Sequence, residues 1–188
     1  MTFSLRSLLV LVFVGTAVGL AALPFIGEPG LANPKTAGFL GLWINFIGAF
    51  HPVFLHLPIG ALLLLMTMEG LGILTCGRVR VDAVWPLLFA LGTSVLALVT
   101  GYSLYLTGSY TGELIQMHKR DAFLFCGVLL LTTAWSLWST LAKKNSRLIR
   151  GGYLAGLGLS VLLMTKAGHY GGEITHGDPL DQLPQKIL

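Results

Sequence analysis

The chain has 188 residues, of which 54% are hydrophobic and only 11% are charged, and its mean hydropathy is +0.78. Soluble domains carry about 25% charged residues, so this composition excludes an ordinary soluble protein and predicts an integral membrane protein. The formal net charge of +4 is small and falls in short loops. It indicates a topology signal, not a nucleic-acid-binding surface.

Five apolar runs are long enough to cross a bilayer, which takes about 20 residues in a helix. They cover residues 8–26, 52–75, 84–106, 121–141 and 149–167. Continuous apolar runs favour helices over the alternating strands of a membrane barrel. We therefore expect an all-α integral membrane protein with five transmembrane helices, an N-terminal anchor plus a four-helix bundle.

Three regions follow from these runs. Residues 1–30 are expected to form a transmembrane anchor, although Arg6 and the small residues Ala21 and Ala22 also resemble a signal peptide. Residues 31–50 form an outer connecting segment, in which Trp43 and Phe46 favour a short interfacial helix over a buried loop. Residues 51–188 form the four-helix bundle with an outer C-terminal tail.

Basic residues predict the orientation, because Lys and Arg gather on the cytoplasmic side of membrane proteins. They precede the first run and follow the second and fourth, at Arg6, Arg78, Arg80, Lys143, Lys144, Arg147 and Arg150. This pattern places the N-terminus inside and the C-terminus outside. Lys119 and Arg120 would then lie outside, against the rule, so we expect them to have a partner.

With this topology all five histidines fall near the outer end of the bundle. One begins the second run, one lies five residues deeper, one precedes the fourth run, one follows the fifth, and one lies in the tail: His51, His56, His118, His169 and His176. Polar side chains are scarce in such a chain, so five imidazoles in one layer predict a binding site.

Depth makes His56 the strongest ligand candidate, because a polar side chain within an apolar run is costly unless it is paired. His51 and His56 differ by about 140° around a helix with 100° per residue, so they should face different directions. His118 and His169 are their available partners, since cofactor sites in bundles use side chains from facing helices. Four imidazoles could hold two haems, or one haem with two supporting groups. His176 is expected to support the site or to meet solvent.

Small and basic residues near these histidines suit a haem. Gly60 and Gly168 would leave room for a porphyrin, although glycine also serves close helix packing in membranes. Three cations could pair with haem propionates or extend to lipid headgroups, namely Lys119, Arg120 and Lys166.

Glu69 interrupts the second apolar run. An acid within a membrane span is a functional candidate, for proton transfer or for contact with a quinone headgroup. The alternative is a salt bridge to Arg78 or Arg80.

The histidines also lie in recognisable motifs. The segment from His51 to Gly60 (HPVFLHLPIG) resembles the opening motif of an uncharacterised bacterial four-helix membrane protein family, the DUF2231-like proteins. Residues 101–110 with His118-Lys119-Arg120 resemble its second motif, and Gly168-His169-Tyr170-Gly171-Gly172 with residues 175–177 its third. The resemblance covers about residues 45–183, and Glu69 matches an acid common in the family.

That family often accompanies c-type cytochromes, so the resemblance implies electron transfer and b-type haem bound by His51, His56, His118 and His169. We therefore expect a bacterial inner-membrane subunit with one or two haems b and a periplasmic histidine cluster. It would pass electrons between the quinone pool, or a partner subunit, and a periplasmic cytochrome c. Alternatives are a cofactor-free anchoring subunit of a respiratory or photosynthetic complex, and a non-haem copper, iron or zinc site. No nucleophile, phosphate loop or carboxylate pair favours an independent enzyme.

Overall fold

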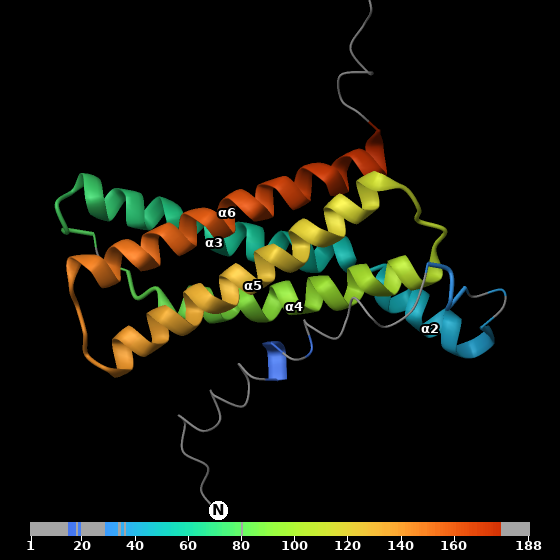
Figure 1. Cartoon of the computed structure of the whole chain (residues 1–188), viewed down its shortest axis with the longest axis horizontal. Helices are drawn as coiled ribbons and strands as arrows, with labels where there is room; N and C mark the ends of the chain where they lie inside the picture. The colour runs from blue at the N-terminus through green and yellow to red at the C-terminus, as the bar shows by residue number, and fades with distance from the viewer. Residues whose placement is uncertain are drawn as a thin grey trace, which may run out of the picture.

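The computed structural model describes residues 15–17, 19, 29–33, 35, 37–79 and 81–177. The principal elements are α2 (Gly38–Gly48), α3 (His51–Leu74), α4 (Val84–Thr107), α5 (Glu113–Leu141) and α6 (Arg147–His176) (Figure 1). No strand occurs in these ranges, so the expected all-α class is confirmed. Most of the anchor predicted over 8–26 lies outside the described residues.

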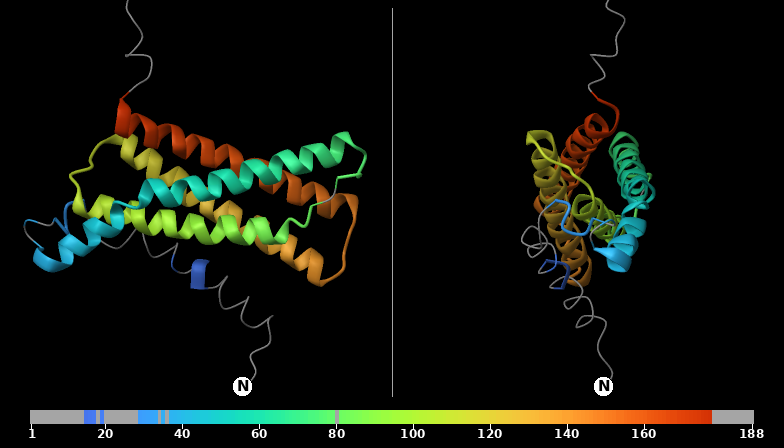
Figure 2. Two further views of the ribbon diagram at one scale, coloured as in Figure 1. Left: turned by 180° about the vertical axis from the view of Figure 1, so that it is seen from behind. Right: turned by 90° about the vertical axis from the view of Figure 1, so that its right-hand side faces the viewer.

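Helices α3 to α6 form an antiparallel four-helix bundle made of two hairpins (Figure 1). Seen end-on in Figure 2, α5 and α6 lie on one side and α3 and α4 on the other, with α2 against α4. We call the end where α3 and α5 begin the histidine end. The opposite end, with the loops at residues 75–83 and 142–146, is the basic end.

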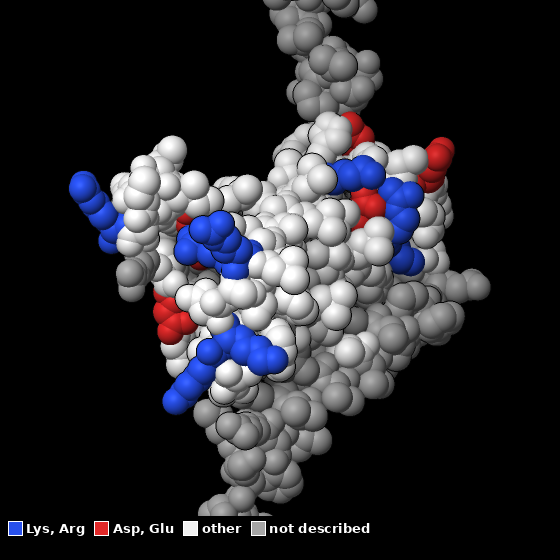
Figure 3. All heavy atoms as spheres, turned by 60° about the vertical axis from the view of Figure 1, so that its left-hand side comes forward, with Lys and Arg blue, Asp and Glu red and all other residues white. Residues whose placement is uncertain are grey.

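Four segments of the described chain are long and apolar enough to cross a membrane: Gly38–Leu74, Val84–Thr107, Glu113–Leu141 and Arg147–His176. Large apolar side chains also point outward along them, including Leu64, Leu131 and Leu162. A helix that is apolar on its outer as well as its inner face suits lipid. On the face shown in Figure 3, Lys, Arg, Asp and Glu gather toward the two ends and leave a broad uncharged area between them.

Two helices are longer than the apolar runs predict. The helix α5 begins at Glu113, not at residue 121, and α6 continues to His176, not 167. His118 and His169 are therefore helical residues, not residues of the flanking loops, and His176 ends α6 instead of lying in a tail. Hydropathy marks only the part of a helix that suits hydrocarbon, whereas backbone hydrogen bonding continues into the polar boundary.

The predicted short helix within residues 31–50 is confirmed as α2. Its aromatic side chains form a row of edge-to-face contacts through Phe39, Trp43, Phe46 and Phe50. These rings are exposed, and aromatic rings at the end of a bundle suit a membrane interface.

The two hairpins repeat one pattern of burial. Leu62 lies as many residues after His51 in α3 as Leu129 lies after His118 in α5, and both leucines are fully buried. Counted back from Gly101 in α4 and Gly171 in α6, four buried positions coincide, namely Leu87 with Leu157, Ala90 with Ser160, Ser94 with Met164, and Ala97 with Ala167. The hairpins α3–α4 and α5–α6 are thus equivalent units, as in membrane proteins built from parallel repeats.

Candidate metal centre at the histidine end

His51 and His118 face each other inside the bundle. Their ring centroids are 6.5 Å apart, and the ring planes make an angle of 84°. His51 begins α3, and His118 lies near the start of α5. Both side chains are half-buried. Each hairpin therefore contributes one imidazole, from the equivalent position of its first helix.

A backbone carbonyl on the second helix of the hairpin holds each ring. His51 Nδ1 donates to the carbonyl oxygen of Ala97 at 2.8 Å, and His118 Nδ1 donates to that of Ala167, also at 2.8 Å. A carbonyl can only accept, so Nδ1 carries the hydrogen in both rings and Nε2 is the nitrogen able to bind a metal. Histidines that bind metals are commonly oriented in this way, by a hydrogen bond from the other ring nitrogen.

A glycine lies against each ring, one turn beyond the carbonyl. A Cβ added to Gly101 would lie 2.8 Å from His51 Cε1, and one added to Gly171 would lie 3.0 Å from His118 Cε1. In both pairs the next nearest ring atoms are Nδ1 and then Nε2. Both imidazoles thus occupy space that any side chain at these positions would need.

The other histidines lie at the same end but do not join this pair. His56 is exposed, and its Nδ1 donates to the carbonyl oxygen of Pro52 on its own helix. The side chain of His169 is 59% exposed, and its Nε2 lies 2.9 Å from Glu173 Oε1. His176 is exposed where α6 ends. His56 was the favoured candidate because it lies deep within an apolar run. Its position along the helix does not determine whether its side chain faces the bundle or the surroundings.

The cations expected beside the histidines have partners of their own. Asp121, whose side chain is 2% exposed, lies 2.7 Å from Arg120 Nε and 3.2 Å from Lys166 Nζ. Lys119 Nζ lies over the ring of Tyr105, 3.7 Å from its centroid. The expectation that Lys119 and Arg120 have partners is confirmed, and Asp121 is the residue that sequence reasoning missed. The signal available in the sequence was an acid directly after Lys119 and Arg120, the two basic residues predicted to lie on the outer side.

The glycines proposed to accommodate a porphyrin are open. Neither Gly60 nor Gly168 has an atom of another element within 4 Å of the place where a Cβ would stand. The close glycine contacts at this end belong instead to Gly101 and Gly171.

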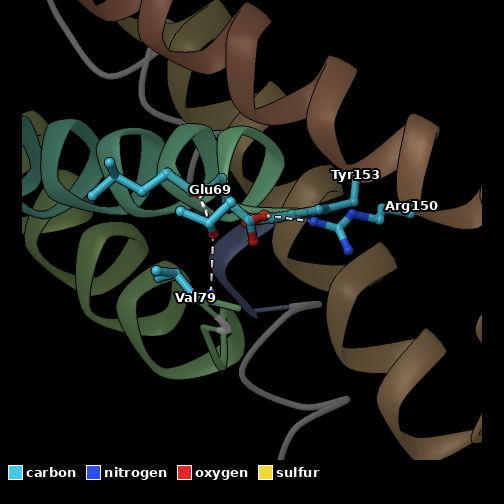
Figure 4. A network of polar contacts seen from close by, with 6 residues as sticks. Glu69, Val79, Arg150 and Tyr153 are labelled. Atoms are coloured by element: carbon cyan, nitrogen blue, oxygen red, sulfur yellow. Dashed lines mark hydrogen bonds and ion pairs between the residues drawn. The ribbon is translucent and has the colours of Figure 1, made fainter. Parts of the chain in front are cut away.

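Glu69 lies toward the other end of the bundle, and its side chain is 12% exposed. Its Oε1 accepts a hydrogen bond from the Tyr153 hydroxyl at 3.1 Å, and its Oε2 lies 3.4 Å from Arg150 Nη2 (Figure 4). An ion pair to Arg78 or Arg80 was expected; the structure pairs Glu69 with Arg150 of α6 and not with Arg78, and Arg80 lies outside the described residues. The reason is that α6 packs beside α3. This pairing favours a structural role for Glu69 over proton transfer or quinone contact.

The part of the chain that the structure describes contains no group of three or more His, Cys, Asp and Glu side chains suited to one metal ion. A bare structural metal usually takes four protein ligands and a catalytic zinc three. The described residues at this end of the bundle offer two neighbouring imidazoles, His51 and His118.

Comparisons with known proteins add no relative. No family model matches the chain, and neither the curated proteins nor the solved structures contain a match.

Proposed function

We propose that His51 and His118 bind one haem b iron between them, and that the protein is a membrane-embedded electron-transfer subunit of a larger redox complex. The observation that carries this proposal is the opposed pair of imidazoles, with ring centroids 6.5 Å apart. An imidazole nitrogen binds a transition metal at about 2 Å, so two imidazoles on opposite sides of one ion have centroids roughly 6 Å apart. The separation of the two rings therefore supports the proposal that His51 and His118 would together hold the iron of one haem.

Bound haem supplies one-electron chemistry. The chain would hold and tune it through the hydrogen bonds from Nδ1 of each ring to Ala97 and Ala167, which orient the ligands. Partial burial of both rings limits the access of water, and the degree of solvent exposure is one of the factors that set the reduction potential of a haem. Lys119, Arg120 and Lys166 would supply positive charge for the propionates, with Asp121 holding the last two in position.

One haem is favoured over two. His56 and His169 are exposed and each is hydrogen-bonded within its own helix, so they form no second opposed pair. The position of the pair near one end of the bundle suits exchange of electrons with a protein at the membrane surface. We assign that surface to the periplasmic side of a bacterial inner membrane, with the basic end in the cytoplasm. A c-type cytochrome and the quinone pool, or another subunit, are the proposed electron partners.

A spectroscopic experiment tests this function. The protein is purified from cells supplied with haem, and reduced-minus-oxidised spectra are recorded with a pyridine haemochrome assay. We expect b-type bands and about one haem per chain. His51→Ala and His118→Ala should each lower haem content or remove the six-coordinate spectrum, whereas His56→Ala and His169→Ala should change neither.

A colourless wild-type protein would overturn the proposal. Metal analysis of that preparation would then separate the remaining hypotheses. Stoichiometric copper, iron or zinc that depends on His51 and His118 would indicate a non-haem site made of two protein ligands and exogenous ones. A preparation without metal would indicate an anchoring subunit.

A further inference from the structure

The geometry points to a second site, at the basic end, that binds the phosphate group of an anionic ligand. A cleft of about 630 Å³ lies there between the α3–α4 loop and the α5–α6 loop. Pockets for small ligands have volumes of roughly 300–1,000 Å³. The cleft is lined by both acidic and basic side chains, so its selectivity depends on which charges already have partners.

The acids of the cleft are engaged. Glu69 accepts from Tyr153 and pairs with Arg150, which Figure 4 shows reaching toward it from α6. Asp82 Oδ1 accepts the backbone N–H of Val84 at 3.2 Å, at the start of α4, where a negative charge is favourable.

Glu69 and Arg150 balance each other, so the remaining charges of the cleft are those of Asp82, Lys143 and Lys144, which leave it net positive. Among the described residues, no carboxylate lies at ion-pair distance from Lys143 or Lys144. Lys144 Nζ lies over the Trp138 ring at 5.2 Å from its centroid, a contact that leaves its charge in place. Two ammonium groups without a counter-ion beside a cleft favour an anion.

Lys143 lines the cleft from just after the end of α5, in a left-handed backbone conformation. Its φ is +51°, in the left-handed region that glycine prefers. The N–H of Lys143 bonds to the Thr140 carbonyl at 3.1 Å, and that of Lys144 to the Ser139 carbonyl at 2.9 Å, which is the pattern that ends many helices with a glycine.

Phosphate is the anion that the position of the cleft favours. The cleft lies where the apolar helices end, at the level expected for lipid headgroups, and basic pockets between membrane helices bind the headgroups of anionic phospholipids. A free phosphate has the same chemistry, so the test must separate the two sources.

The test uses the full-length protein in neutral detergent. Binding of phosphatidylglycerol and of phosphatidylcholine is measured by native mass spectrometry, together with the thermal unfolding midpoint, with and without inorganic phosphate. The double variant Lys143→Gln/Lys144→Gln is compared with Arg78→Gln/Arg147→Gln. Arg78 and Arg147 lie at the same end, and replacing them removes the same amount of positive charge, but neither lines the cleft.

We expect the lysine variant to weaken phosphatidylglycerol binding by about tenfold or more and the arginine variant to leave it nearly unchanged. Competition by millimolar inorganic phosphate would identify a soluble ligand, and its absence a lipid headgroup; both support the site. Equal losses in the two double variants, or equal binding of both lipids by the wild type, would overturn it. Lys143→Gly separates binding from folding, since it should bind less phosphatidylglycerol at an unchanged or higher unfolding midpoint.

Discussion

Gly101 and the imidazole of His51 share one space, because a Cβ on the glycine would lie 2.8 Å from His51 Cε1. Gly171 has the same relationship to His118, at 3.0 Å. Each ring is held by a backbone carbonyl and fills space that a glycine one turn further along the same helix leaves free. The orientation of the two imidazoles therefore depends on two residues that bind nothing themselves.

Gly101→Ala and Gly171→Ala should displace the adjacent imidazole and lower haem content while the fold persists. A side chain moves more easily than a helix, and alanine within a helix is otherwise more stable than glycine by about 0.5–1 kcal/mol. Pyridine haemochrome content and helical circular dichroism measure the two effects. Gly60→Ala and Gly168→Ala are the matched controls, since a Cβ meets nothing there. Equal haem loss in all four variants would contradict this account of the rings.

Asp121→Asn should destabilise the histidine end. The buried carboxylate accepts a hydrogen bond from Arg120 and forms an ion pair with Lys166, and hydrogen bonds to charged groups contribute about 1.5–3 kcal/mol. Because both cations remain half-exposed and can turn to water, we expect a loss near the lower value. Thermal unfolding in detergent measures it. Glu113→Gln, an exposed acid at the start of the same helix, should change the midpoint little, and a similar shift in both variants would count against the buried ion cluster.

Tyr153→Phe should cost more stability than Arg150→Gln, although both residues contact Glu69. The Tyr153 hydroxyl is part of a buried side chain and donates to a carboxylate at 3.1 Å, a bond that contributes about 1.5–3 kcal/mol. The Arg150 guanidinium is 53% exposed and lies at 3.4 Å, and exposed ion pairs contribute about 0–1 kcal/mol. Unfolding by denaturant in detergent gives the order of the two variants. The reverse order would mean that the ion pair dominates this network.

Cys76 reports the orientation of the bundle without any mutation. It is exposed at the basic end, whereas Cys126 is buried between helices. If the basic end faces the cytoplasm, a membrane-impermeant thiol reagent should label Cys76 in inverted membrane vesicles and not in intact spheroplasts. Cys126 should stay unlabelled in both. Labelling of Cys76 in spheroplasts would reverse the proposed orientation.

The apolar runs predicted the helical class and the positions of four long apolar helices, and the aromatic residues Trp43 and Phe46 predicted the short helix before the bundle. They did so because hydrocarbon solubility is a property of composition. The runs did not predict where α5 begins or where α6 ends, since hydrogen bonding along a helix does not stop at the boundary of the hydrocarbon. For the same reason the sequence placed His118 and His169 in flanking segments, not within helices.

The gathering of histidines at one end also followed from the order of the spans. The order of the spans did not predict which imidazoles meet, because that depends on the rotation of each helix about its axis. His51 turns toward α4 and meets His118, while His56 turns outward. The internal equivalence of the hairpins was readable only once the carbonyl and glycine contacts of the two rings could be compared.

Equivalent hairpins carried on one chain can diverge independently. A hairpin that paired with an identical copy would surround both histidines with the same neighbours. Here Thr100, directly before Gly101, places its hydroxyl oxygen 3.5 Å from His51 Nδ1, whereas the residue directly before Gly171 is Tyr170, whose ring lies beside His169. In the proposed site the surroundings of His51 and His118 would therefore differ in polarity, although the two rings are held in the same way.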